Sequence, residues 1–130
     1  MVEAIVALVI FATFIAGATR VILAHSQLSD KARAHYTAIN LAKNHVEQVR
    51  NMRRADYAQI LAMTENGVQV NDDGVPDSAN GKFRRTTTIT ESTNNIYRLE
   101  IEVMVEIKNP ITLAFEGENE HVKSYMAHLL

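Results

Sequence analysis

VEAIVALVIFATFIAGATRVILA, residues 2–24, is the stretch that decides how the rest of the chain is organised. It has no charged residue between Ala4 and Thr19, and beyond Arg20 the apolar run continues to Ala24. A helix needs about 20 such residues to cross the hydrocarbon core of a bilayer. We therefore predict a membrane-length helix with Glu3 at its start and Arg20 near its end, where the long arginine stem can reach an interface.

A cleaved secretory signal is the main alternative for an apolar run in this position. Such a signal has its positive charge ahead of the apolar stretch and small residues at its end. Here the acid Glu3 leads and Arg20 follows. The order of charges favours a segment that is retained, in a membrane or in a helix bundle.

The helix is expected to continue far beyond the apolar run. No glycine or proline occurs between Gly17 and Gly67, so nothing in the backbone chemistry stops it. Apolar residues at spacings of three, four or seven then form an amphipathic stripe: Leu28, Ala32, Ile39, Ala42, Val46 and Val49. A helix from about Val2 to Met52 would be roughly 75 Å long, so only its second half is expected to lie on a small domain.

The remaining residues predict a loop and an antiparallel sheet. Residues 55–63 are typical of a last helical turn or a short helix, and residues 64–82 are dense in the residues of loops. Residues 96–108 alternate apolar and charged side chains and form the clearest strand. Further strands are expected at 82–90, 111–117 and 121–130, with a turn at 117–119.

These elements predict an α+β fold: a long N-terminal α-helix, with a protruding apolar first half, packed by its second half on a small antiparallel β-sheet. The inward face of the clearest strand is expected to hold Tyr97, Leu99, Ile101, Val103, Val105 and Ile107. From the helix, Ile39, Val46 and Val49 are expected to join them in the core. The predicted regions are 1–24 for the apolar helix, 25–54 for the amphipathic helix, and 55–130 for the loop and sheet.

Composition excludes several functions. A net charge of -2 and a pI near 6.2 over 130 residues provide no basic surface, so nucleic acid is not an expected partner. There is no cysteine for a disulfide or a thiolate site. The chain also lacks a Gly-x-Ser-x-Gly elbow, a phosphate loop and a Gly-x-Gly-x-x-Gly motif, and we predict that it is not an enzyme.

Two patterns raise the question of a metal. The five histidines include no pair spaced i, i+4, so they do not predict a metal site: His25, His35, His45, His121 and His128. The loop NDDGVPDSANG, residues 71–81, resembles part of a thrombospondin type 3 calcium repeat without its tandem copy. Asn71, Asp73 and Asp77 are the candidate calcium ligands, and a plain loop of turn-forming residues is the alternative.

The chain resembles the type IV pilin and type II secretion pseudopilin family. VEAIVALVIFATFIAG is similar to the start of mature pilins. NLAKNHVEQVRNMRRADYAQI, KFRRTTTIT and IYRLEIEVMVEI are similar to a minor pilin of the PilV kind or a small pseudopilin. The resemblance implies processing by a membrane peptidase that also methylates the new N-terminus. It also implies a helical filament of identical or related subunits with the apolar helices at its core.

The resemblance gives roles to particular residues. It implies that Glu3 neutralises the N-terminal amine of a neighbouring subunit, with Met1 at the same contact, because a carboxylate in an apolar bundle is costly unless it is paired. The residues expected to bundle in the filament core are Ala4, Ile5, Leu8, Val9, Phe11, Ala12, Phe14, Ile15 and Val21. The family often has a helix-kinking proline in this region. Gly17 is the weak point here, so helix melting on assembly is expected to centre on it.

The pattern departs from the family at its start. Only Met1 and Val2 precede Glu3, where the family has an aromatic residue and a threonine, so the mature start differs or the leader lies outside this sequence. We expect a filament subunit that resides in the inner membrane before assembly and then, through the pilus or secretion machinery, on the cell surface. The alternatives are a pseudopilin of a type II secretion system and a non-polymerising single-pass membrane-anchored binding or sensor protein, to which Arg20 would give a topology signal.

Overall fold

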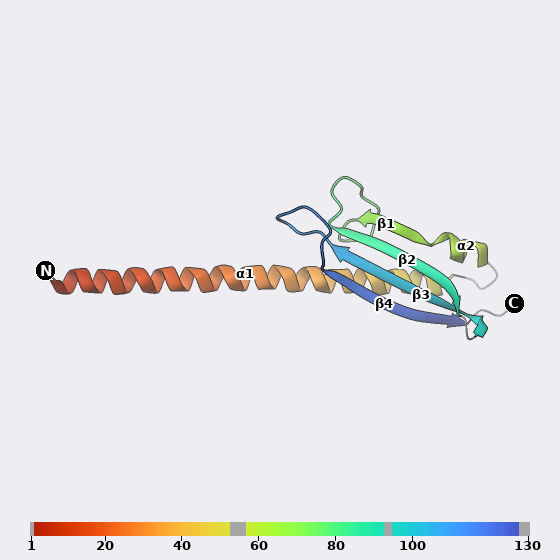
Figure 1. Cartoon of the computed structure of the whole chain (residues 1–130), viewed down its shortest axis with the longest axis horizontal. Helices are drawn as coiled ribbons and strands as arrows, with labels where there is room; N and C mark the ends of the chain where they lie inside the picture. The colour runs from red at the N-terminus through yellow and green to blue at the C-terminus, as the bar shows by residue number, and fades with distance from the viewer. Residues whose placement is uncertain (1, 53–56, 93–94, 128–130) are drawn as a thin grey trace. The chain divides into compact units, whose positions relative to one another are not determined.

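The structure is a computed structural model that describes residues 2–52, 57–92 and 95–127 (Figure 1). The chain divides into two compact units, Met1–Arg33 and Ala34–Leu130, and each is described by itself. The predicted α+β fold is confirmed: a long N-terminal helix packs on a four-stranded antiparallel sheet.

Helix α1 runs without interruption from Val2 to Arg50. It passes through Gly17 as regular α-helix, as the absence of any further glycine or proline predicts. Glu3 lies in its first turn and Arg50 in its last turn. Both charges are favourable where they lie, because the N-terminal end of a helix is partially positive and the C-terminal end partially negative.

The first unit holds the apolar part of α1. Every described residue up to Arg33 is exposed in the isolated chain. By length and composition α1 can cross a membrane, with an 18-residue window of mean hydropathy 2.3 of which 0% is buried. The hydroxyl groups of Thr13 and Thr19 donate to the carbonyl oxygens of Ile10 and Ile15, at 2.8 and 2.9 Å. These bonds satisfy the hydroxyl protons within the helix, as a segment without access to water requires.

The second unit contains a sheet in which each strand pairs with the next along the chain. Short helix α2, Tyr57–Ala62, precedes the sheet, and Tyr57 Oη donates to Glu91 at 2.6 Å. The strands are β1 (Glu65–Val70), β2 (Phe83–Ser92), β3 (Asn95–Ile107) and β4 (Asn119–Ala127), in the spatial order β1-β2-β3-β4 (Figure 1). All three pairings are antiparallel.

The core lies between the inner face of the sheet and residues 38–49 of α1. The predicted alternation of β3 is confirmed from Leu99 to Ile107, whereas the side chain of Tyr97 lies outside the described residues. The fully buried side chains include Val49, Ile60, Val70, Leu99, Ile101, Val103 and Val105. Burial of each apolar side chain of this size contributes about 1.5–3 kcal/mol.

The predicted helix stripe is partly wrong. The buried positions are Ala38, Leu41, Ala42, His45, Val46 and Val49. Ile39 is half-buried, and Leu28 and Ala32 are exposed, because the sheet covers the helix only from Ala34 onward. Ala38, with 0% exposure, allows close approach of helix and sheet, and His45 fills a position that apolar periodicity alone assigns to a hydrophobic residue.

Two predictions about strands are also wrong. Residues 65–70 form β1 although 64–82 were expected to be a loop, because Gly67, at φ +65°, lies in a register shift that lets the Asn-Gly pair stay within a strand. Residues 111–117 do not form a strand. Instead, Asn109 Oδ1 accepts hydrogen bonds from the backbone N–H groups of Ile111 and Thr112, which bends the chain into a turn.

Candidate functional site

The predicted assembly residues all lie on the exposed first unit, except Met1, which lies outside the described residues. The side chains expected to bundle are exposed by between 48% and 73%: Ile5, Leu8, Val9, Phe11, Phe14, Ile15 and Val21. Ala4, Ala12 and Gly17 are exposed as well. An apolar surface of this extent marks a site of contact with protein or lipid.

Glu3 and Arg20 are the two full charges of this surface. In the sequence up to Ser29 there is no other Asp, Glu, Lys or Arg. Neither residue forms an ion pair with another described residue. A charge that enters an apolar environment needs a partner of opposite sign, so any environment that covers this helix has to provide one for each.

The candidate calcium loop is held together by its own side chains. Asn71 Oδ1 accepts from the backbone N–H groups of Asp73 and Val75, both at 3.0 Å, and Asp77 Oδ1 accepts from Ala79 and Asn80. These bonds occupy oxygens that a cation would need. Asn71, Asp73 and Asp77 do line one shallow hollow, together with Asp72, Asn80 and Lys82.

A positively charged side chain, that of Lys82, already lies at this hollow. Lys82 Nζ lies 3.2 Å from Asp72 Oδ2, so one carboxylate of the loop is paired with an ammonium group. Over the described part of the chain there is no group of three or more His, Cys, Asp or Glu residues with the arrangement of a metal site. The geometry is that of a loop built from Asx turns.

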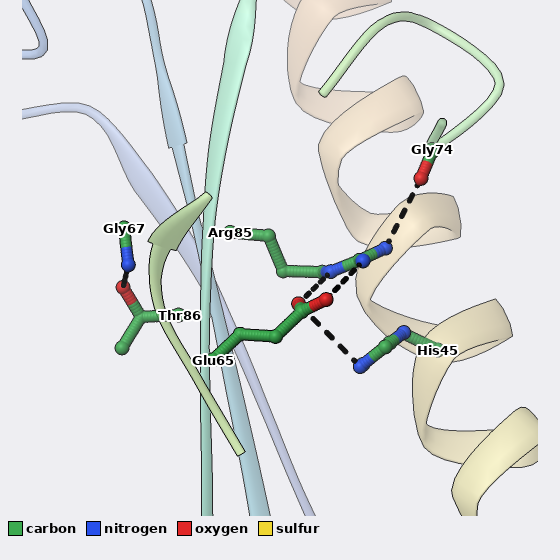
Figure 2. Close-up of polar contacts among 6 residues, drawn as sticks. All are labelled: His45, Glu65, Gly67, Gly74, Arg85 and Thr86. Carbon is green, nitrogen blue, oxygen red and sulfur yellow. Dashed lines mark hydrogen bonds and ion pairs between the residues drawn. The ribbon is translucent and has the colours of Figure 1, made fainter. Parts of the chain in front are cut away.

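A polar triad that the sequence analysis missed lies inside the second unit (Figure 2). Arg85 projects from β2 to the helix side of the sheet and donates to both carboxylate oxygens of Glu65 in β1, from Nε at 2.6 Å and from Nη2 at 2.9 Å. His45 Nε2 of α1 lies 3.7 Å from Glu65 Oε2. Arg85 Nη1 also donates to the carbonyl oxygen of Gly74, at 3.4 Å. The triad thus joins α1, β1, β2 and the loop after β1.

Burial determines the protonation of this triad. His45 is 3% exposed, and neither of its ring nitrogens has a hydrogen-bond partner among the described residues. Burial, and after it the positive charge of Arg85, lower the pKa of His45 below its ordinary value, while Glu65 opposes the shift. His45 is therefore neutral at neutral pH, and the ion pair of the triad is Glu65 with Arg85.

Two signals in the sequence identify two members of this triad, His45 and Arg85, in retrospect. His45 occupies the apolar stripe of the helix, three residues after Ala42 and four before Val49. Arg85 has the same parity along its strand as Phe83 and Ile89, which places it on the inner face. The acid partner could not be found in this way, because Glu65 lies in a segment that was expected to be a loop.

A second histidine joins α1 to β4. His35 Nδ1 lies 2.7 Å from Glu120 Oε1, and its Nε2 lies 3.3 Å from Glu118 Oε2. These contacts fix the first packed turn of α1 at the end of the sheet where β4 begins. Of the other histidines, His121 contacts Glu102 at 2.5 Å, His25 lies on the exposed first unit, and His128 lies outside the described residues.

The outer face of the sheet carries pairs of opposite charge. Arg84 forms two hydrogen bonds with Glu106, at 2.6 and 2.7 Å, and Lys123 forms an ion pair with Glu100. Arg98 stacks on the ring of Tyr125, with 3.8 Å between Cζ and the ring centroid. The charges of this face are therefore largely compensated by neighbours within the sheet.

Comparison with known proteins found no matching family model, no matching curated protein and no matching solved structure.

Proposed function

We propose that this chain is a structural subunit of a type IV pilus-like extracellular filament and that it has no enzymatic activity. The observation that carries the proposal is the lone carboxylate of Glu3 at the start of a fully exposed, membrane-length apolar helix that continues into a helix packed on a sheet. An anchor alone needs the apolar helix but does not require an acid near its end.

The exposed apolar surface of α1 can be covered in two successive environments, first by lipid and then by neighbouring subunits. In the membrane, lipid covers the side chains from Ala4 to Ala24, which have the required length. In a filament, the same side chains of neighbouring subunits cover one another. The release of this surface from lipid costs little when helices of the same kind replace it, so a single segment serves in both states.

The role of Glu3 in this proposal is contact between subunits. A carboxylate within a bundle of apolar helices is expensive unless it meets a cation. The resemblance to pilins implies that the N-terminal amine of a neighbouring subunit is that cation. The proposed location is the inner membrane before assembly and the cell surface afterwards, and a pseudopilin of a type II secretion system is the alternative within the same family.

Electron microscopy of material sheared from the cell surface tests the proposal. The wild-type chain should form fibres, and Glu3→Ala should insert into the membrane at the wild-type level and form few or no fibres. Asp30→Ala is the matched control, since Asp30 is an exposed acid of the same helix beyond the apolar run. Normal fibres from Glu3→Ala would refute the assembly role of this carboxylate.

A membrane-anchored binding or sensor protein is the second candidate, because α1 is compatible with a single membrane span. That candidate predicts that the wild-type chain stays in the membrane as a monomer. Cross-linking of intact cells followed by electrophoresis distinguishes it from a subunit, which should give a ladder of oligomers.

A further inference from the structure

We infer that Glu3 of one copy binds Arg20 of a second copy, and that this pair sets an axial stagger of about 25 Å between neighbouring apolar helices. The inference rests on the proposed function and names the contact that orders the assembly. It starts from Arg20 because no described residue of the same chain forms an ion pair with it.

Arg20 needs an anion wherever the apolar helices pack together. Apolar residues flank it on both sides, from Ala4 to Gly17 and from Val21 to Ala24, so neighbouring helices that cover this surface also remove its guanidinium from water. Glu3 is the one acid in the first 29 residues. A neighbouring amine at Glu3 would occupy part of that carboxylate and would still leave Arg20 without an anion.

The pair cannot form within one chain. Arg20 lies 17 positions after Glu3, and in α1 the two residues are about 25 Å apart along the axis at about 1.5 Å per residue. The ion pair therefore joins two copies. All copies enter the membrane with the same topology, so their helices are parallel.

Parallel helices in register would be unfavourable. Each Glu3 would lie beside another Glu3, and each Arg20 beside another Arg20, with like charges in an apolar environment. A shift of 17 residues along the axis replaces both repulsions with one attraction. Glu3 and Arg20 lie about 100° apart around the helix, so each copy uses one face toward the copy ahead and another face toward the copy behind. Contacts of this head-to-tail type produce an open helical filament.

The stagger also accounts for the apolar residues beyond Arg20. It brings residues 4–11 of one helix alongside residues 21–28 of the next. Both segments have exposed large side chains: Ile5, Leu8, Val9 and Phe11 in the first, and Val21, Ile22, Leu23 and Leu28 in the second. A membrane span that ended at Arg20 would leave Leu28 without an apolar contact. The stagger instead places Leu28 beside residue 11 of the neighbouring helix.

Exchange of the two charges tests the inference in the full-length chain. Glu3→Arg and Arg20→Glu should each lower the yield of sheared fibres by at least about tenfold, since each places like charges together. The double variant restores an attractive pair with opposite polarity and should raise the yield above that of either single variant, although position 3 then no longer attracts the neighbouring amine. Asp30→Arg, which makes the same charge change outside the apolar run, should assemble normally. The amount of each variant in the membrane is measured in parallel.

The results separate the inference from the proposed function. A double variant that assembles no better than the worse single variant, or Arg20→Gln fibres at the wild-type yield, would overturn the pair while wild-type fibres leave the filament standing. A wild-type chain that forms no fibres would overturn both.

Cysteine cross-linking measures the stagger directly, because the chain has no cysteine of its own. Val6 and Leu23 are 17 residues apart, and their side chains are 51% and 58% exposed. A mixture of Val6→Cys and Leu23→Cys copies in one membrane should give a dimer band that neither variant gives alone. Equal dimer bands from the separate variants would show helices in register and would overturn the stagger.

Discussion

Replacing Glu65 with alanine tests whether burial determines how much the Glu65–Arg85 ion pair contributes to stability. Arg84 and Arg85 are neighbours in β2 and point to opposite faces of the sheet. Each donates two hydrogen bonds to one glutamate, with distances of 2.6 and 2.7 Å to Glu106 and 2.6 and 2.9 Å to Glu65. The two pairs have the same chemistry, so a comparison of Glu65→Ala with Glu106→Ala isolates the effect of their surroundings.

The expected costs follow from the exposure of the arginine that remains. The Arg85 side chain is 8% exposed, and without Glu65 it retains the single bond to Gly74 at 3.4 Å. Loss of one partner of a buried pair costs about 3–5 kcal/mol, and we expect the lower end because Glu65 is itself 22% exposed and its removal admits water. The Arg84 side chain is 36% exposed, so Glu106→Ala should cost about 0–1 kcal/mol.

Urea titration of the full chain in a mild non-ionic detergent measures both costs. Far-ultraviolet circular dichroism follows unfolding, and backbone hydrogen exchange of β3 reports the sheet without contribution from the apolar helix. A loss of about 3 kcal/mol is a large fraction of the stability of a small domain. Equal costs for the two variants, or a greater cost for Glu106→Ala, would refute the reasoning from burial.

The remaining predictions also concern the second unit. Because burial lowers the pKa of His45, the unfolded chain takes up a proton at higher pH than the folded chain, and acid should destabilise the fold. The free energy of unfolding should fall as the pH drops below 6.5, the ordinary pKa of histidine, by up to about 1.4 kcal/mol per pH unit until the lowered pKa of His45 is reached. His45→Gln should remove this slope when urea titrations are repeated at several pH values. Gly74→Ala should lower the melting temperature more than Gly117→Ala. Both residues have positive φ, +80° and +76°, but an added Cβ at Gly74 would lie 3.1 Å from a leucine side chain, whereas an added Cβ at Gly117 meets open space. A larger loss of melting temperature for Gly117→Ala would contradict this. Ile101→Ala should lower the free energy of unfolding by about 2–5 kcal/mol in urea titration, and Ile111→Ala, at 89% exposure, by less than about 0.5 kcal/mol. Similar losses for the two variants would contradict the assigned core.

The elements that the sequence predicted well are those with a long, regular pattern. Helix α1 has no proline and only one glycine, Gly17, over its length, and β3 alternates from Leu99 to Ile107, so local preference and burial agree in both. Errors arose where the pattern was short. Strand β1 has six residues with Gly67 among them, and the turn after β3 depends on one side chain, Asn109, which a count of apolar residues does not register.

The candidate sites were predictable to different degrees. Glu3 stands out in the sequence because its neighbours are apolar, and no packing information is needed to see it. The triad of His45, Glu65 and Arg85 depends on which strands lie side by side, and pairing between distant segments is not encoded in local periodicity. The calcium prediction for Asn71, Asp73 and Asp77 rests on composition, which turns and cation sites share.

The order of the strands has a consequence for when the protein folds. Because β1, β2, β3 and β4 pair with their neighbours along the chain, the sheet can grow hairpin by hairpin as each strand leaves the ribosome or the translocation channel. The helix face at residues 38–49 is synthesised first and is not fully covered until β3 arrives, while the apolar segment ahead of it already has the length to enter a bilayer. Early anchoring would therefore keep this uncovered helix face near a membrane surface and away from other nascent chains.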